Sequence, residues 1–299
     1  MSIESPTAEA KVQQVISGIR NLPTPPIVFH QIQKVVNDHN ASAAQVAAVL
    51  AEDPAMSVKV LKLTNSAFYG LAREVDSVKQ AVVIVGMEAI KNLVLSASVL
   101  DMFKGDSTLD SEFQEEFWRH SLATAFCCRL LARRINSRGI VDPDTGFASG
   151  LLHDVGKMII CCYLPRQHTQ IRIERQNRPD ATNSDVELLV LQCTHEQIGA
   201  ALASQWKLPS KLANAIEYHH KPLECEGPEP VAHLVHVANY LAKKTFLDRQ
   251  EEHLIGSLAP GIMEYLALEP SDLDHFCEQL REDYSKAETF MQMAGINAA

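Results

Sequence analysis

The sequence is poor in aromatic residues, shows little regular alternation of apolar and polar residues, and has no long apolar run. Aromatic residues make up only 6% of the 299 positions, and abundant alanine and leucine favour helices over sheets. No apolar run approaches the ~20 residues that a bilayer-spanning helix requires. The polar residues 1–11 do not resemble a signal peptide. We therefore expect an all-α protein located in the cytoplasm.

Zinc-type cysteine pairs and an excess of positive charge are also missing. Two pairs of the seven cysteines, Cys127-Cys128 and Cys161-Cys162, are sequence neighbours, and none has C-x-x-C spacing, so reduced core thiols are expected. The formal net charge is −10, from 27 basic and 37 acidic residues. This balance opposes binding to nucleic acid or to anionic lipid. We expect neither nucleic acid nor a membrane as a partner.

One basic cluster interrupts this acidic background. Arg129, Arg133, Arg134 and Arg138 are spaced as on a helix. Charged clusters with this spacing are ordinarily solvated, so we interpret these arginines as a solvent-exposed helix face.

Residues 12–103 are typical of a series of short helices separated by proline, glycine and capping residues. Ser42, Asp53 followed by Pro54, and Ser77 are expected to cap the starts of three helices. Gly86 separates the last two predicted helices. We predict an N-terminal helical subdomain over residues 12–103.

Longer helices are predicted in the second region, residues 111–299. The short polar stretch 104–110 contains a glycine and is predicted to join the two regions, and the chain length suits two domains. The expected helices cover residues 112–135, 146–164, 184–206, 209–220 and 231–243, with one or two more from residue 270. We predict that the N-terminal subdomain packs on this C-terminal helical bundle.

The most informative motif is the pair His153 and Asp154 within an otherwise apolar segment. A carboxylate among leucines, isoleucines and valines is costly to bury unless a cation or hydrogen bonds compensate it. Lys157, one helical turn further on, could pair with this carboxylate or reach a bound anion. An ordinary surface Asp–Lys pair is the alternative, which the apolar flanks disfavour.

Other histidines and acids fall at positions suited to metal binding. Glu116 and His120 are four residues apart and can share an ion on a helix, although a surface pair would look the same. His195 lies on the apolar stripe of its predicted helix and should face inward. It is either a metal ligand or a buried neutral histidine. His219 and His220 end a helix, where the dipole also favours them. Because adjacent helical side chains point about 100° apart, both reach one site only if it is wide.

Mixed imidazole and carboxylate donors suit divalent transition metals. We predict a site for one ion or two, with iron or manganese favoured and zinc possible. The candidate ligands are Glu116, His120, His153, Asp154, His195, His219 and His220.

The order of these residues resembles the HD superfamily of metal-dependent phosphohydrolases and, within it, the HD-GYP ligand set. The resemblance implies that His120 is the first ligand and that His153 and Asp154 form the paired motif. It also implies that Lys157 steadies a phosphate if the chain is an active enzyme. The later ligand histidines correspond to His195, His219 and His220.

Two departures from that superfamily concern catalysis. Asn239 stands where the superfamily has its last metal ligand, an aspartate, and no Gly-Tyr-Pro motif follows His220. A neutral amide oxygen binds a hard cation more weakly than a carboxylate does. We keep Asn239 as a candidate ligand of a degenerate site.

The N-terminal region resembles the HDOD family within this superfamily. The resemblance is carried by Leu22-Pro23 and by residues 52–57, 65–70 and 81–86, and it covers residues 16–241. HDOD proteins are regarded as bacterial output or signalling domains that act beside response regulators or cyclic dinucleotide enzymes. Many have lost the metal ligands, whereas this chain has kept most of them.

The resemblance implies a bacterial signal-transduction protein with a metal-binding, degenerate pocket. Its expected partner is another signalling protein or a phosphorylated small ligand. The first alternative is an active metal-dependent phosphohydrolase, a phosphodiesterase, in which Glu116 replaces the missing carboxylate. The second is an interaction module whose histidines are packed core residues.

Overall fold

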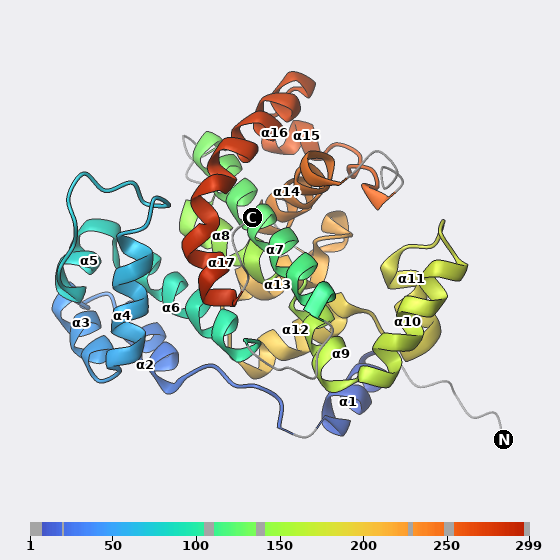
Figure 1. The fold of residues 1–299 in the computed structure, drawn as a ribbon, viewed down its shortest axis with the longest axis horizontal. Coiled ribbons are helices and arrows are strands. Elements are labelled where there is room, and N and C mark those ends of the chain that lie inside the picture. The colour runs from blue at the N-terminus through green and yellow to red at the C-terminus, as the bar shows by residue number, and fades with distance from the viewer. Residues whose placement is uncertain are drawn as a thin grey trace.

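The computed structural model describes residues 8–19, 21–104, 111–135, 141–226, 230–247 and 254–295. Within these ranges the chain is helical and has no β-strand (Figure 1). The predicted all-α fold is confirmed. The N-terminal helices are α1 (Ala8–Gly18), α2 (Ile27–Val36), α3 (Ala43–Ala51), α4 (Pro54–Thr64), α5 (Val78–Val85) and α6 (Met87–Met102).

The helices that follow form the larger part of the molecule. They are α7 (Ser111–Ile135), α8 (Pro143–Leu152), α9 (Val155–Tyr163), α10 (Pro165–Asn177), α11 (Asn183–Leu191), α12 (His195–Gln205), α13 (Ser210–Tyr218), α14 (Pro230–Phe246), α15 (Ile262–Leu266), α16 (Pro270–Tyr284) and α17 (Glu288–Ala294), with short 3-10 turns η2 (Pro222–Glu224) and η4 (Ser285–Ala287).

Local capping residues begin the N-terminal helices as predicted. The backbone N–H of Met56 donates to Asp53 Oδ1 at 2.9 Å, and Ser42 and Ser77 accept from the third residue of their helices. Gly86 separates α5 from α6 with a φ of +95°, a conformation that glycine adopts readily. These starts are set by the sequence close to each helix.

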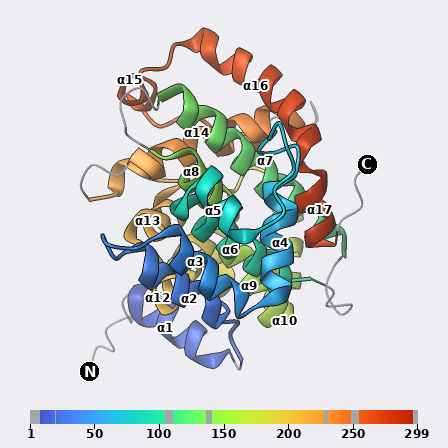
Figure 2. The ribbon, with the colours of Figure 1, turned by 90° about the vertical axis from the view of Figure 1, so that its left-hand side faces the viewer.

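Helix α6 joins the N-terminal helices to the rest of the fold. Its residues from Ala89 to Leu100 are all buried. It packs against α2, α4 and α5 on one side and against α8 and α17 on the other, as Figure 1 shows. Figure 2 looks onto the face where α2, α3 and α5 cover it. The N-terminal helices therefore pack on the C-terminal bundle.

The long helix α7 is the centre of the C-terminal bundle and packs against α8, α14 and α16. Gly150 of α8 lies so close to α7 that a Cβ atom there would be 2.7 Å from Ala125 Cα. This backbone contact brings the end of α8 beside the middle of α7.

Two predicted helices are each broken in two. The helix expected over residues 146–164 ends at Leu152 and restarts at Val155, so that His153 and Asp154 form the break. The helix expected over residues 184–206 is interrupted at Gln192, whose φ is +61°. At the first break Asp154 meets histidines from other parts of the fold, and after the second break a local capping box restarts the helix.

Helix α11 starts at Asn183, one residue before the predicted start at residue 184. Thr182 caps this helix together with Asp185, and Thr194 caps α12 together with Gln197. Threonine and serine are nearly equivalent caps.

The basic cluster was interpreted wrongly at Arg129, which is only 8% exposed. Its Nη1 donates to the carbonyl oxygen of Phe68 at 2.7 Å, and its guanidinium carbon lies 3.7 Å from the centre of the Phe68 ring. Its Nε lies 3.8 Å from Oδ1 of Asp144. This long-range set of partners compensates the buried charge. Arg133 and Arg134 are exposed as expected, and Arg138 lies outside the described residues.

The predicted connection at residues 104–110 falls, from residue 105 on, outside the described residues. The division into residues 12–103 and 111–299 therefore stays a prediction.

In the described ranges, no helix taken alone is long and apolar enough to cross a membrane. Two helix pairs, bent by 116° and 114°, meet the length and composition requirement only together.

Candidate metal centre

Asp154 lies at the break between α8 and α9 and is 1% exposed. Its Oδ2 atom accepts a hydrogen bond from Lys157 Nζ at 2.6 Å. Burial opposes ionisation of this carboxyl, but His153 and Lys157 together hold its pKa well below the usual value of 3.8. Asp154 is therefore a buried carboxylate anion.

Four histidines from separate elements surround this carboxylate. The Nε2 atoms of His195 and His219 lie 3.2 and 3.4 Å from Oδ1. The Nε2 atoms of His153 and His120 lie 3.2 and 3.7 Å from Oδ2. The predicted convergence of these residues, which are spread over a hundred positions, is therefore present in the fold.

Hydrogen bonds on the other side of the rings orient the histidines. The Nδ1 atoms of His153 and His219 lie 2.7 and 2.8 Å from the carbonyl oxygens of Gly150 and Ile216. Because a carbonyl can only accept, these Nδ1 atoms carry the hydrogen. Burial keeps His219 neutral by lowering its pKa to about 4, so its Nε2 presents a lone pair toward Asp154.

Acceptor atoms without partners gather at this point. Among the described residues, Nε2 of His120, His153, His195 and His219 and Oδ1 of Asp154 are buried without a hydrogen-bond partner. Buried polar atoms are rarely left unsatisfied, and a cation between these nitrogens and Asp154 would satisfy them together. Burial lowers the pKa of His195, but Glu187 and Glu196 raise it to about 9, so a metal ion would displace a proton from this ring. Imidazole and carboxylate donors in this arrangement could hold a metal ion.

The donor atoms fall into two sets that share Asp154. One set comprises Asp154, His195, His219 and His220, and the other comprises His120, His153 and Asp154. Within each set the ligand atoms lie within 4.8 Å of one another. We call Asp154 and these five histidines the Asp154 cluster. A carboxylate has two oxygens, so Asp154 could contribute a donor atom to both sets.

His219 and His220 contribute to the same donor set, although helical neighbours would diverge. Helix α13 ends at Tyr218, so both histidines follow its last helical residue. Their ring centres are 4.1 Å apart, and the His220 ring centre lies 5.4 Å from that of His195. Burial, followed by His219 and His195, holds the pKa of His220 well below 6.5.

Two other predicted ligands, Glu116 and Asn239, are not members of the Asp154 cluster. Glu116 is exposed on α7 and belongs to neither donor set. Asn239 is 4% exposed on α14, which packs against α7, α8 and α13. Its Oδ1 atom is buried and has no partner among the described residues. Metal ligation by Glu116 or Asn239 stays a prediction.

Lys243, one turn beyond Asn239 on α14, is a basic residue of this region that sequence reasoning missed. It is half-buried and makes no ion pair within the described part of the chain. Burial and the charge of Lys157 lower its pKa to about 8, against an opposite effect of Asp154. The spacing of four residues from Asn239 was the available signal.

Two glycines allow the close packing that places His195. A Cβ atom on Gly156 of α9 would lie 2.0 Å from the carbonyl oxygen of His195. A Cβ atom on Gly199 would lie 2.6 Å from Cγ2 of Ile216. The first turns of α9 and α12 are therefore in backbone contact, which holds His195 against the Asp154 break.

A comparison with protein families identifies the family of this chain. The HDOD domain family matches residues 22–222, about two thirds of the chain. The chain belongs to the HDOD family. The resemblance stated from the sequence motifs is confirmed, and the matched range includes all of the Asp154 cluster.

Solved structures share the HDOD fold along nearly all of this chain. A candidate phosphohydrolase of Shewanella amazonensis is 24% identical, with a TM-score of 0.73 over 95% of this chain and 98% of its own. A candidate signal-transduction protein of Marinobacter aquaeolei is 22% identical, with a TM-score of 0.73 over 98% and 68%. An HDOD protein of unknown function from Geobacter sulfurreducens is 22% identical, with a TM-score of 0.68 over 96% of both chains. These likenesses show the fold.

Curated relatives of this HDOD chain are longer than it is. An uncharacterised protein of Treponema pallidum is 27% identical over 252 residues, which are 83% of this chain and 47% of the relative. The Bacillus subtilis protein YuxH is 27% identical over 122 residues, 40% of this chain and 28% of the relative. The chain therefore spans less than half the length of these curated relatives.

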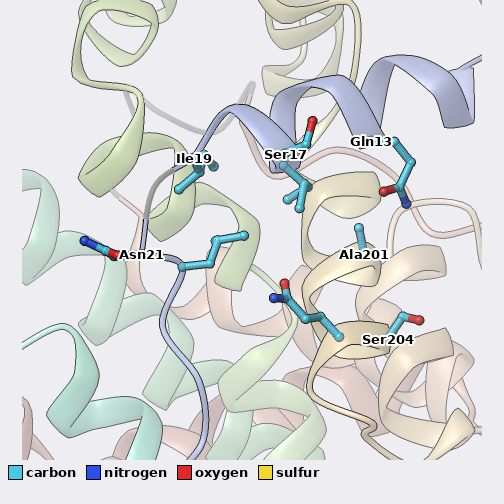
Figure 3. A pocket seen from close by; sticks show the side chains of 9 residues that line it. Gln13, Ser17, Ile19, Asn21, Ala201 and Ser204 are labelled. Atoms are coloured by element: carbon cyan, nitrogen blue, oxygen red, sulfur yellow. The ribbon is translucent and has the colours of Figure 1, made fainter.

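The HDOD chain also has an open pocket between α1 and α12, of about 570 Å³ (Figure 3). Gln13, Ser17 and Ile19 line it from the α1 side, and Ala201 and Ser204 line it from α12. No residue of the Asp154 cluster lines this pocket.

Proposed function

We propose that this HDOD chain is a bacterial signal-transduction module whose Asp154 cluster binds one or two divalent transition metal ions. The observation that carries the proposal is the group of buried acceptors without partners around an ionised carboxylate. A cation would satisfy these acceptors together. Iron and manganese are favoured because the donor sets combine imidazole nitrogens with a shared carboxylate, and zinc would also be accepted.

The Asp154 cluster, together with the lysines near it, is proposed to bind a phosphorylated small ligand with little turnover. A bound metal would supply a Lewis acid and lower the pKa of water. Lys157, which now pairs with Asp154, and the unpaired Lys243 would provide positive charge for a phosphate. Asn239 provides no negative charge where the HD superfamily has an aspartate, so hydrolysis would be slow.

A cytoplasmic signalling protein is the proposed partner of the N-terminal helices. Val58 on α4 is 64% exposed, and Val83 and Ile84 on α5 are 67% and 48% exposed. Exposed apolar side chains of this kind are common in interaction surfaces.

The test of the degenerate pocket is a phosphodiesterase assay of the Mn²⁺-loaded chain on cyclic dinucleotides. We expect little hydrolysis by the wild type and a gain in the Asn239→Asp variant. Asn177→Asp adds the same charge at an exposed position of α10 and serves as the matched control. Rapid hydrolysis by the wild type that Asn239→Asp leaves unchanged would contradict the proposal.

The second candidate is an active metal-dependent phosphohydrolase. It is favoured by the two lysines near Asp154, because positive charge beside a metal site suits phosphoryl substrates. The candidate phosphohydrolase from Shewanella amazonensis has the same fold. In this reading Glu116 supplies the missing carboxylate, so Glu116→Gln would lower the activity of the wild type. An interaction module without a metal would instead show no metal binding at all.

A further inference from the structure

Glu187 makes two short hydrogen bonds to His195 from the side of the ring that faces away from Asp154. Glu187 is 3% exposed. Its Oε2 atom lies 2.7 Å from Nδ1 of His195 and also accepts from the backbone N–H of His195 at 2.7 Å. One carboxylate oxygen therefore holds both the ring and the main chain of a candidate metal ligand.

The break between α11 and α12 makes this contact geometrically feasible. In a continuous helix, residues eight positions apart are separated by about 12 Å along the axis. Gln192 has left-handed φ and ψ angles of 61° and 17°, and α12 begins three residues later. The chain therefore turns back, and Glu187 of α11 meets the first residue of α12.

Glu196 supports the same ring from a greater distance. Its Oε2 lies 3.3 Å from His195 Nδ1, and its Oε1 accepts from Ser184 Oγ at 2.7 Å. Glu187, His195 and Glu196 are close enough together to be metal donors themselves. However, two N–H groups already donate to Glu187 Oε2, so this trio is better suited to supporting His195 than to holding an ion.

We propose that Glu187 is the positioning residue of the metal centre, which holds the His195 ring so that Nε2 points at Asp154. The inference rests on the proposed metal-binding function. A carboxylate that accepts from the far nitrogen of a ligand histidine fixes the ring orientation and increases the basicity of the ligating nitrogen. Loss of such a partner typically lowers metal affinity about 10–100-fold.

The experiment compares Glu187→Ala and Glu187→Gln with Glu264→Gln, a matched change at an exposed position of α15. Mn²⁺ affinity is measured by titration. We expect a loss of about 10–100-fold for Glu187→Ala. Glu187→Gln should recover most of it because the amide oxygen still accepts, and the control should match the wild type.

A second readout uses the metal-free protein. The Nδ1 proton of His195, followed by NMR in ¹⁵N-labelled protein, should be protected from exchange in the wild type and in Glu187→Gln, and unprotected in Glu187→Ala. If Glu187→Ala does not fold, Glu187→Gln is compared with Glu187→Met by the same two measurements. Unchanged affinity together with an unchanged Nδ1 signal in folded Glu187→Ala would overturn the inference.

The two readouts separate this inference from the proposed function. If the wild type binds none of Mn²⁺, Fe²⁺ and Zn²⁺, the metal-binding function fails. Protection of the Nδ1 proton by Glu187 would then still support its positioning of His195, and no effect on that proton would overturn it.

Discussion

Lys157 Nζ donates to Asp154 Oδ2 at 2.6 Å. The other oxygen of this carboxylate, Oδ1, faces His195 and His219. The lysine places a full positive charge in hydrogen-bond contact with Asp154. It therefore compensates this buried anion in the metal-free protein, and a bound cation would take over that role.

The first prediction concerns this pair. Lys157→Met leaves Asp154 without its cation, so we expect the metal-free protein to lose about 2–4 kcal/mol of unfolding free energy. Saturating Mn²⁺ should restore a large part of the loss, since a metal compensates the same carboxylate. Urea unfolding with and without Mn²⁺ measures both effects. Lys79→Met on exposed α5 is the control, and equal stability of the two variants would contradict the prediction.

The second prediction concerns the contact between α9 and α12. Gly156→Ala would place a methyl group 2.0 Å from the His195 carbonyl oxygen, so α12 must move away. We expect a loss of at least about 2 kcal/mol, together with weaker Mn²⁺ binding. Gly18→Ala meets no atom within 4 Å and should be neutral or stabilising by up to about 1 kcal/mol. Thermal unfolding that leaves Gly156→Ala equal to Gly18→Ala would refute the packing argument.

The third prediction concerns the pH dependence caused by Lys243. Its pKa is about 8 in the folded protein and 10.5 ordinarily, so the unfolded chain binds this proton more tightly. Stability should therefore rise with pH between 8 and 10.5, while below 8 the full cost of the buried charge remains. Lys243→Met should be more stable than the wild type by about 1–3 kcal/mol at neutral pH.

The control for Lys243 is the pH profile itself. The stability advantage of Lys243→Met should shrink steadily above pH 8 and disappear near pH 10.5. An advantage that stays constant across that window would mean that packing, and not the charge, causes it. Urea unfolding of both proteins in the metal-free state gives the comparison.

The fourth prediction concerns the attachment of residues 66–70 to α7 and α8. Arg129 contacts Phe68 through its carbonyl and its ring, and it lies near Asp144. Arg129→Met removes these contacts and should lower the unfolding free energy by about 2–4 kcal/mol. Arg133→Met, four residues later and exposed, should change it by less than about 0.5 kcal/mol. Similar losses in both variants would show that Arg129 contributes no specific attachment.

Short-range signals were sufficient for much of the fold. Asp53, Ser42 and Ser77 bond to backbone groups three residues away, so their effect is contained in the neighbouring sequence. His153 and Asp154 were found because polar groups in an apolar segment need a partner wherever the segment packs. The ligand histidines were then collected by residue type and by resemblance.

Features that depend on distant contacts could not be derived in this way. Gln192 leaves the helix at a position where its type gives no warning, and the break matters because Glu187 then reaches His195. Arg129 appeared to be solvated because its partners are residues 68 and 144. Lys243 is near Lys157 and Asp154 only through the packing of α14, and its spacing from Asn239 was the single local signal.

The central claim is that the acceptors of the Asp154 cluster converge on a cation. Its most direct test is Mn²⁺ titration of the metal-free chain by calorimetry, beside Asp154→Asn and the exposed control Asp76→Asn. The account predicts one or two ions per chain in the wild type and in Asp76→Asn, and binding too weak to measure in folded Asp154→Asn. A wild type that binds no Mn²⁺, Fe²⁺ or Zn²⁺, or an Asp154→Asn variant that binds them equally well, would contradict it.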